Sequence, residues 1–486
     1  LGDTLQLDTS IAANPQLMAP GTIAPYNGPG SGTWSFSSAH QQVLFTNIED
    51  NSPPTPFHLT IDNSISLIGN IVIMRDSTQT RVQIRDGSNV GPIIFQGLLT
   101  SVLSVRVLGS AGDDIVTVDD INTLPDFLLT VPGVADNPTL TGVGEIFFDG
   151  RGGSDTFVFN LNGPAVDQTY ALGTGSSPGS QEGEILSVGT GISLTSYFSN
   201  VELVQRVGTN AALGTSTVTG DNNNNDIAVT ANGVLTRTST TGYVPYEIQN
   251  SSVSQLTVSG LAGDDNLQLL SLGSGPATNL GITLSGGNDT DTLRVHSTGG
   301  QTITTTLRGG SGSDIFQLFS ATNTVDSILG PVIVDGSDGL IGGNNDRLVI
   351  VDSGDATADN VVISAVDPAT TADYRVEGVN TTAGNDVVFR NIDTLTYTGT
   401  QGNDLIDAQF VSTTPPHDLS VATINGWLGG DQFLLFTSDQ AGGTAPLPTG
   451  VPSGLASISL NGDAPGNPNG LDGNDALHGG AGDDAL

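Results

Sequence analysis

The stretch that decides the fold reads Gly309-Gly310-Ser311-Gly312-Ser313-Asp314-Ile315-Phe316. Its pattern is G-x-x-G-x-D-x-U, in which U is a large apolar residue. Glycine adopts positive φ angles and lets two backbone segments approach closely, so the glycines predict a sharp turn. The aspartate lies in this turn, where its carboxylate can accept backbone N–H groups or ligate a hard cation. Apolar residues alternate with polar ones from Ile315 onward, which predicts a strand directly after the turn.

The same frame recurs at seven other places along the chain. The aspartates of these copies are Asp114, Asp155, Asp265, Asp404, Asp431, Asp475 and Asp484. Looser copies are centred on Asp291, Asp346 and Asp386. A single motif of this kind means little, whereas eight close copies indicate a chain built from repeated turn-and-strand units.

The composition is strongly acidic. The chain has 12 basic residues, all arginine, against 50 acidic ones, and its formal net charge is −38. We therefore expect no nucleic-acid partner and no attraction to anionic membranes, but an attraction to cations, calcium in particular. The chain has no cysteine, which excludes disulfides and thiolate metal sites. No stretch is long and apolar enough to predict a membrane span.

A longer repeat surrounds several of the turns. A strand begins nine residues before the aspartate in three copies, namely at Val105 before Asp114, Leu256 before Asp265 and Leu395 before Asp404. The spacing of these copies predicts an irregular lead-in and three divergent β repeat modules, followed by a different terminal block. The predicted boundaries are 1–50, 51–205, 206–350, 351–460 and 461–486. Both ends of the sequence fall within a repeat unit, so we expect a mature fragment or a segment of a longer chain.

The spacing of the turns indicates an all-β fold. Turns within the modules follow one another at steps of 23 to 32 residues. Such steps suit one coil of a β-solenoid, or β-helix-like rod, in which each coil buries its inward residues on the next. Tandem β-sandwich modules are the alternative, because they also need many short strands between turns rich in glycine and proline.

The terminal block contains a tandem nonapeptide. Gly479, Gly480, Gly482, Asp484 and Leu486 fill the defined positions of G-G-x-G-x-D-x-U-x, and a similar unit lies nine residues earlier around Asp475. This block resembles the hemolysin-type calcium-binding (RTX) repeat, and the whole chain is similar to divergent repeat segments of giant secreted bacterial surface proteins. The resemblance implies a parallel β-roll with calcium between turns, for which Asp475 and Asp484 would supply ligands.

The isolated copies of the motif allow two interpretations. Ca²⁺ prefers about six to eight oxygen ligands, and one turn supplies only two or three, so a site forms only where coils stack in register. The predicted calcium ligands among these copies are Asp114, Asp155, Asp265, Asp291, Asp314, Asp404 and Asp431. In the other interpretation, each carboxylate accepts hydrogen bonds from backbone N–H groups of its own turn.

No catalytic motif emerges from the sequence. The five histidines are scattered, and none lies in a metal-ligand spacing such as H-E-x-x-H. Carboxylates occur in repeated positions, which favours a scaffold, because a catalytic pair need occur only once. We therefore expect a noncatalytic, calcium-stabilised subunit of an extracellular bacterial fibre, surface layer or adhesin. Its expected partners are copies of itself and cell-surface glycans. A carbohydrate-binding or carbohydrate-cleaving β-helix is the alternative.

Overall fold

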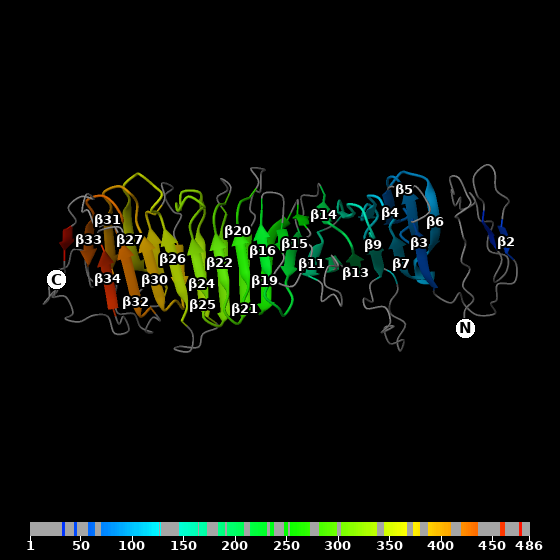
Figure 1. Cartoon of the computed structure of the whole chain (residues 1–486). Helices are drawn as coiled ribbons and strands as arrows, with labels where there is room; N and C mark the ends of the chain where they lie inside the picture. The colour runs from blue at the N-terminus through cyan, green and yellow to red at the C-terminus, as the bar shows by residue number, and fades with distance from the viewer. Residues whose placement is uncertain are drawn as a thin grey trace. The chain divides into compact units, whose positions relative to one another are not determined.

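The computed structural model of the chain is nearly all β, as the sequence predicts (Figure 1). Among the residues that the structure describes, the helical element is one 3-10 turn, η1 (Leu99–Ser101). The described residues are 32–34, 43–45, 57–63, 70–125, 127, 145–163, 165–172, 183–189, 192–208, 214–230, 234–237, 247–250, 253–272, 281–298, 303–337, 345–366, 373–379, 387–409, 419–435, 457–461 and 476–478.

The chain divides into two compact units. The first unit comprises Leu1–Thr217 and Thr240–Val253, and the second comprises Val218–Ser239 and Ser254–Leu486. The division into three repeat modules stays a prediction.

The first unit contains two extended sheets and a short hairpin. Its strands are β1 (Gly32–Trp34), β2 (Val43–Phe45), β3 (Phe57–Asp62), β4 (Asn70–Arg75), β5 (Arg81–Asp86), β6 (Ile93–Leu98), β7 (Val102–Leu108), β8 (Ile115–Asp119), β9 (Ile146–Asp149), β10 (Thr156–Asn160), β11 (Asp167–Leu172), β12 (Gly183–Gly189), β13 (Ile192–Ser199), β14 (Leu203–Val207) and β18 (Glu247–Asn250). In one sheet, β4, β8, β10, β14 and β18 pair in parallel, and β5 and β6 extend it by antiparallel pairing. In the other, β3, β7, β9 and β13 are parallel, and β12 and β11 follow antiparallel. β1 and β2 form an antiparallel pair.

The second unit has the more regular arrangement. Its strands are β16 (Asp226–Val229), β17 (Val234–Arg237), β19 (Val253–Ala262), β20 (Asn266–Leu269), β21 (Gly281–Asn288), β22 (Thr292–Val295), β23 (Thr305–Ser311), β24 (Ile315–Leu318), β25 (Val332–Ser337), β26 (Arg347–Val351), β27 (Asn360–Ala365), β28 (Tyr374–Glu377), β29 (Val387–Arg390), β30 (Thr394–Thr398), β31 (Leu405–Gln409), β32 (Val421–Asn425), β33 (Gln432–Leu435), β34 (Ser457–Asn461) and β35 (Ala476–His478). In the sequence, β15 (Gly214–Thr219) spans the boundary between the two units.

Successive strands of the second unit alternate between two sheets. β19, β21, β23, β25 and β29 pair in parallel in one sheet. β16, β20, β22, β24, β26, β30, β32 and β34 pair in parallel in the other, and lie side by side in Figure 1. Antiparallel strands β28 and β27 connect β29 to a further parallel run of β31, β33 and β35. From β19 to β26, each pair of successive strands therefore contributes one strand to each sheet, and we call such a pair with its turns a coil.

The register of the parallel strands stacks identical kinds of side chain. Apolar residues from successive coils face one another in one column of Val258, Leu284, Leu307, Val334 and Phe389 and in another of Leu267, Leu293, Phe316, Leu348 and Leu395. All ten side chains are at most 1% exposed. Burying one such side chain is worth roughly 1.5–3 kcal/mol, so these columns form the core of the unit.

The repeated glycine–aspartate turns connect the two sheets. The turn before Asp265 leads from β19 to β20, and the turn before Asp404 leads from β30 to β31. The second crossing runs in the opposite direction, because β30 belongs to the sheet of β20. The nine-residue strand-and-turn unit seen in the sequence therefore connects a strand of one sheet to a strand of the other. The connection can run from either sheet.

Candidate functional site

The aspartates of the repeated turns form a ladder of hydrogen bonds from coil to coil. The backbone N–H of Asp265 donates to Oδ1 of Asp291 over 2.8 Å, and that of Asp291 donates to Oδ1 of Asp314 over 2.8 Å. The N–H of Asp314 continues the series to Asp346, also over 2.8 Å, and at the other end Asn225 donates to Asp265 over 2.6 Å. We call these turns and their carboxylates the aspartate ladder.

The ladder recurs elsewhere in both units. In the second unit, the N–H of Asp359 donates to Asp404 and that of Asp404 donates to Asp431, each over 2.8 Å. In the first unit, the N–H of Asp114 donates to Asp155 over 2.8 Å, and the N–H of Asp155 donates to Glu202 over 2.6 Å. In each case the carboxylate accepts from an earlier coil. The aspartates thus bond the coils to one another, as well as shaping their own turns.

The first glycine of the motif makes room for the carboxylate. A Cβ atom built on Gly260 would overlap Oδ2 of Asp265, and one on Gly309 would overlap Oδ2 of Asp314. The same holds for Gly399 against Asp404. A Cβ would also crowd the next coil, since it would lie 2.8 Å from the carbonyl oxygen of Gly286 in the first case. Glycine is therefore needed here for close approach between side chain and backbone.

The ladder contains two kinds of turn, which differ at the residue after the first glycine. Where this residue is Ser110 or Thr400, its φ angle is not positive, and its N–H donates to Oδ2 of the aspartate four residues on. In the second kind of turn this residue has a positive φ angle, which is +66° for Arg151, +86° for Leu261, +126° for Gly287 and +108° for Gly310. In turns of the second kind, Oδ2 of the aspartate receives no hydrogen bond from the described residues; these aspartates are Asp155, Asp265, Asp291 and Asp314.

Burial raises the pKa of the carboxyls in the second kind of turn. The pKa rises to about 7 for Asp155, Asp265 and Asp314, and to about 6 for Asp291. Loss of hydration is the largest cause, and neighbouring carboxylates of the ladder add to it. The single backbone N–H that each Oδ1 accepts acts in the opposite direction. These groups therefore attract either a proton or a cation near neutral pH.

The predicted ligands lie in the ladder but do not gather around one point. All seven described members (Asp114, Asp155, Asp265, Asp291, Asp314, Asp404 and Asp431) are at most 4% exposed. Capping of the aspartate's own turn, the other interpretation from the sequence, is observed at Asp114 and Asp404. The other five carboxylates accept a backbone N–H from an earlier coil instead. Calcium binding at these turns stays a prediction. Asp386, Asp475 and Asp484 lie outside the described residues.

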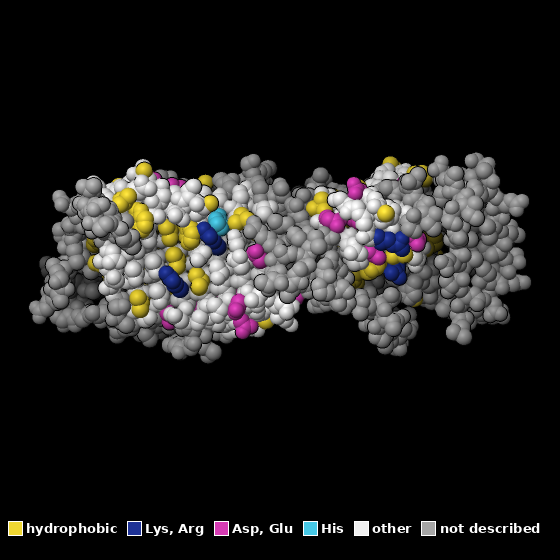
Figure 2. All heavy atoms as spheres, in the orientation of Figure 1, with side chains coloured by type: hydrophobic (Ala, Val, Ile, Leu, Met, Phe, Trp, Pro, Cys, Tyr) yellow, Lys and Arg dark blue, Asp and Glu magenta, His cyan; other side chains and the backbone are white. Residues whose placement is uncertain are grey.

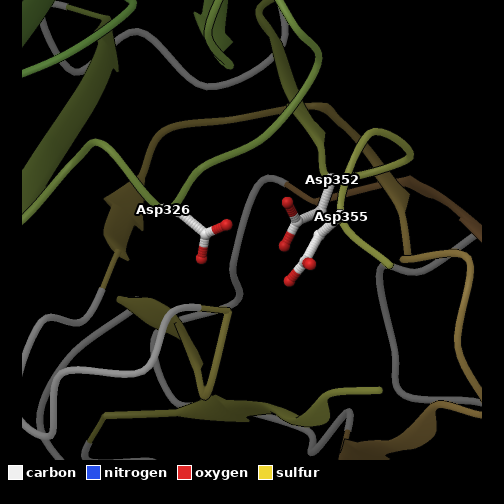
Figure 3. A group of neighbouring side chains, drawn as sticks. All are labelled: Asp326, Asp352 and Asp355. Carbon is white, nitrogen blue, oxygen red and sulfur yellow. The ribbon is translucent and has the colours of Figure 1, made fainter. Parts of the chain in front are cut away.

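A different group of acidic side chains converges in the second unit (Figure 3). The carboxylates of Asp326, Asp352 and Asp355 have one oxygen each within 4.8 Å of the others. Asp326 lies in the loop between β24 and β25, while Asp352 and Asp355 follow β26 directly. Because β24 and β26 are adjacent parallel strands, the loop and the turn of neighbouring coils meet here. We call these three residues the acidic cluster.

Asp352 is the buried member of the acidic cluster. It is 0% exposed, and its Oδ1 accepts the N–H of Val325 over 3.1 Å, whereas its Oδ2 receives no N–H or hydroxyl donor from the described residues. Burial raises the pKa of Asp352, and the carboxylates of Asp359 and Asp326 raise it further. The side chains of Asp352 and Asp359 lie close enough to share one proton.

The acidic cluster was not among the predicted site residues, although the sequence carries a signal for it. Asp352 and Asp355 stand in Asp352-Ser353-Gly354-Asp355, directly after an apolar strand. Asp326 lies 26 residues before Asp352, a step equal to the spacing of successive turns. A search for acidic residues one coil apart would have found the cluster. The motif search missed it because Asp352 does not follow two glycines in the required frame.

The surface view in Figure 2 shows where charged side chains of the described residues lie on one face. On this face the Asp and Glu side chains lie in several separate places, some of them beside arginine side chains. Within the described part of the chain, no helix has the length and apolar character to cross a membrane.

Comparison with known proteins identifies no relative. A scan against models of protein families matched none, and a search of curated proteins found no match. The resemblance of the terminal block to RTX repeats therefore stays a prediction.

Proposed function

We propose that the chain is a noncatalytic structural protein, a calcium-stabilised β-solenoid segment of an extracellular bacterial fibre, surface layer or adhesin. The observation that carries this proposal is the aspartate ladder. The same carboxylate, in the same position of successive turns, bonds the backbone of the preceding coil. A side chain used in this way stabilises the stack, and its repetition favours a scaffold over a single reaction centre.

The parallel pairing of the strands supports a solenoid rather than tandem sandwiches. β-Sandwiches are built mainly from antiparallel strands, whereas β20, β22, β24 and β26 pair in parallel, coil upon coil. A stack of this kind can continue into another copy of the chain, because parallel strands at its ends present backbone groups for further pairing. Self-association into a fibre, and contact with cell-surface glycans, are accordingly part of the proposal.

Calcium fits the electrostatics of the proposed scaffold. The net charge of −38 and the buried carboxyls of the ladder disfavour the folded state unless protons or cations offset them. A cation that binds the folded chain and not the unfolded chain stabilises the folded state by mass action. Folding outside the cell, where calcium is abundant, would follow from this linkage.

The proposal is tested by removing ladder carboxylates from the full chain. At pH 5, where both carboxyls are protonated in the folded chain, we expect Asp291→Ala and Asp314→Ala together to lower the free energy of unfolding by about 0.5–1.5 kcal/mol for each hydrogen bond lost. Hydrogen exchange should become faster at the amides of Asp265 and Asp291, which lose their acceptors. Asp86→Ala, an acidic change outside the ladder, is the control and should leave both amides unchanged.

Two results would contradict the proposed function. One is unchanged stability and amide exchange in the ladder variant. The other is cleavage of a polysaccharide, seen as new reducing ends, that is abolished by changing one carboxylate outside the repeated turns. Electron microscopy of the chain in millimolar calcium tests self-association, for which filaments are expected.

A further inference from the structure

We propose that Asp326, Asp352 and Asp355 bind one hard divalent cation, best matched by Ca²⁺, which fastens the loop between β24 and β25 to the turn after β26. This inference deepens the proposed function, since it places a cation at one named site. The sequence predicted calcium at the repeated turns, and the acidic cluster lies outside those turns. The two ideas can therefore fail separately.

The chemistry of the cluster favours a hard cation. Its three side chains offer only carboxylate oxygens, and hard cations such as Ca²⁺ prefer oxygen ligands, whereas zinc favours nitrogen and sulfur. Ligand oxygens within 4.8 Å of one another fit a Ca²⁺ ion, whose oxygens lie at about 2.3–2.6 Å on either side. Asp326 is exposed and Asp355 is half-buried, so water has access to complete the coordination.

The buried oxygen of Asp352 is the independent sign of a missing partner. Buried polar atoms in proteins nearly always have a hydrogen-bond partner, and an ionised carboxylate costs most when it has none. Oδ2 of Asp352 is fully buried and receives no N–H or hydroxyl donor from the described residues; the carboxyl of Asp359, whose Oδ2 also lacks such a donor, lies beside it. The carboxylate of Asp352 points toward Asp326 and Asp355 in Figure 3. A cation between these groups would satisfy this oxygen.

The surroundings of Asp352 contain further negative charge. Oδ2 of Asp359 is also buried without a hydrogen-bond donor from the described residues. The hydroxyl of Tyr397 is likewise buried and has no hydrogen-bond partner within the described part of the chain, and the charges of Asp404, Asp352 and Asp359 act on it. Asp359 is itself acted on by Asp404, Asp355 and Asp326. The charges that bear on the cluster are thus carboxylates, and a divalent cation would offset several of them at once.

The local backbone is arranged so that a cation would join two coils. The N–H of Gly354 donates to the carbonyl of Asn323 over 2.9 Å, and the N–H of Val325 donates to Asp352. Thr357 donates its N–H and its hydroxyl to the two oxygens of Asp355, which orients that carboxylate and leaves lone pairs for a cation. The loop and the turn are therefore held in place before binding, which lowers the entropy lost on binding.

The first experiment counts bound ions. Chelated full-length chain is titrated with Ca²⁺ by isothermal calorimetry at pH 7.5, alongside the variant Asp326→Asn/Asp355→Asn. The matched control, Asp86→Asn/Glu377→Gln, removes two negative charges outside the cluster. We expect one Ca²⁺ fewer per chain in the cluster variant and no change in the control. Equal numbers of bound ions in all three proteins would overturn the proposal.

The second experiment uses Asp352→Asn to separate a cation from a shared proton. The amide keeps an acceptor for Val325 and removes the buried charge, so we expect a higher Tm than wild type in chelator. We also expect a smaller rise in Tm on adding Ca²⁺. If Ca²⁺ raises the Tm of variant and wild type equally, a proton shared with Asp359 accounts for the cluster and the cation site is wrong. Hydrogen exchange at the amides of Asp265 and Asp291, which lie outside this contact, should not change, so this result leaves the proposed function standing.

Discussion

The turns at Asp404 and Asp265 share one sequence frame but differ in their hydrogen bonds. At Asp404, Thr400 donates its N–H to Oδ2 and its hydroxyl to Oδ1, both over 2.7 Å, in addition to the bond from the preceding coil. At Asp265, the preceding coil donates one N–H to Oδ1, and Oδ2 has no donor among the described residues. The corresponding second residue there is Leu261, with φ of +86°.

This difference separates two roles within the motif. The glycines and the aspartate place the carboxylate against the neighbouring coil in both turns. The residue after the first glycine decides how many hydrogen-bond donors the carboxylate has. Both kinds of turn therefore hold the same scaffold together. The turns whose carboxyl lacks a second donor are the ones in which we expect protons or cations to change stability.

The largest expected effect is a dependence of stability on pH in calcium-free buffer. The folded-state pKa of Asp155, Asp265 and Asp314 is about 7, above the unfolded value near 3.8, so the folded chain retains protons that the unfolded chain releases. Their contribution to stability is therefore greatest below about pH 4 and is lost as the pH rises to about 7. Each unit of pKa difference is worth about 1.4 kcal/mol, so the loss should reach several kcal/mol.

Chemical denaturation between pH 4 and pH 8 measures this effect. The variant Asp265→Asn/Asp314→Asn carries neutral amides at two of these positions, so its free energy of unfolding should fall less steeply with pH than that of wild type. Asp404→Asn is the comparison in the other kind of turn and should lose stability throughout, because Thr400 loses part of its acceptor. Parallel pH profiles for wild type and the double variant would contradict the assignment.

The next effect tests what the two turns have in common. Gly260→Ala and Gly399→Ala would each press a Cβ against the aspartate carboxylate of the same turn. The new Cβ would also lie 2.8 Å from the carbonyl oxygen of Gly286 in the first variant and 2.9 Å from that of Gly426 in the second. We expect losses of about 2–3 kcal/mol in both, as for overpacked cores. Gly281→Ala is the control, because a Cβ there meets nothing within 4 Å. Thermal unfolding checks this, and a mild effect at either of the first two glycines would show that the turn can relax.

The repeated units and the all-β character could be predicted because they depend on local sequence. Glycine before Asp314 and alternation after it predict a turn and a strand, which the structure has as β24. The ladder partners could not be predicted, because the amide that Asp314 accepts belongs to Asp291, one coil away, and its register is set by the stacking of buried columns. The change of sheet between Asp265 and Asp404 also depends on this stacking.

The acidic cluster shows the limit of motif reading most clearly. Asp352 has no glycine frame and is identified by burial and by a missing donor, which are properties of the folded chain. Asp326 joins it only because β24 and β26 are neighbours. The sequence also could not distinguish the two kinds of ladder turn, because leucine and threonine both fit the variable position of the motif.

The smallest expected effect isolates that variable position. Leu261→Gly removes a side chain that is 41% exposed and relieves a positive φ angle, a strain of about 1–2 kcal/mol for an L-residue. The glycine also loses more conformational entropy on folding, by about 0.5–1 kcal/mol, so the net gain should stay below about 1.5 kcal/mol. Thr400→Gly should instead lower stability by about 1–2 kcal/mol, since Thr400 has no positive φ and its hydroxyl bonds Asp404. Denaturant unfolding should therefore show a higher free energy of unfolding for Leu261→Gly and a lower one for Thr400→Gly. A lower value in both variants would mean that the residue after the first glycine does not distinguish the two turns.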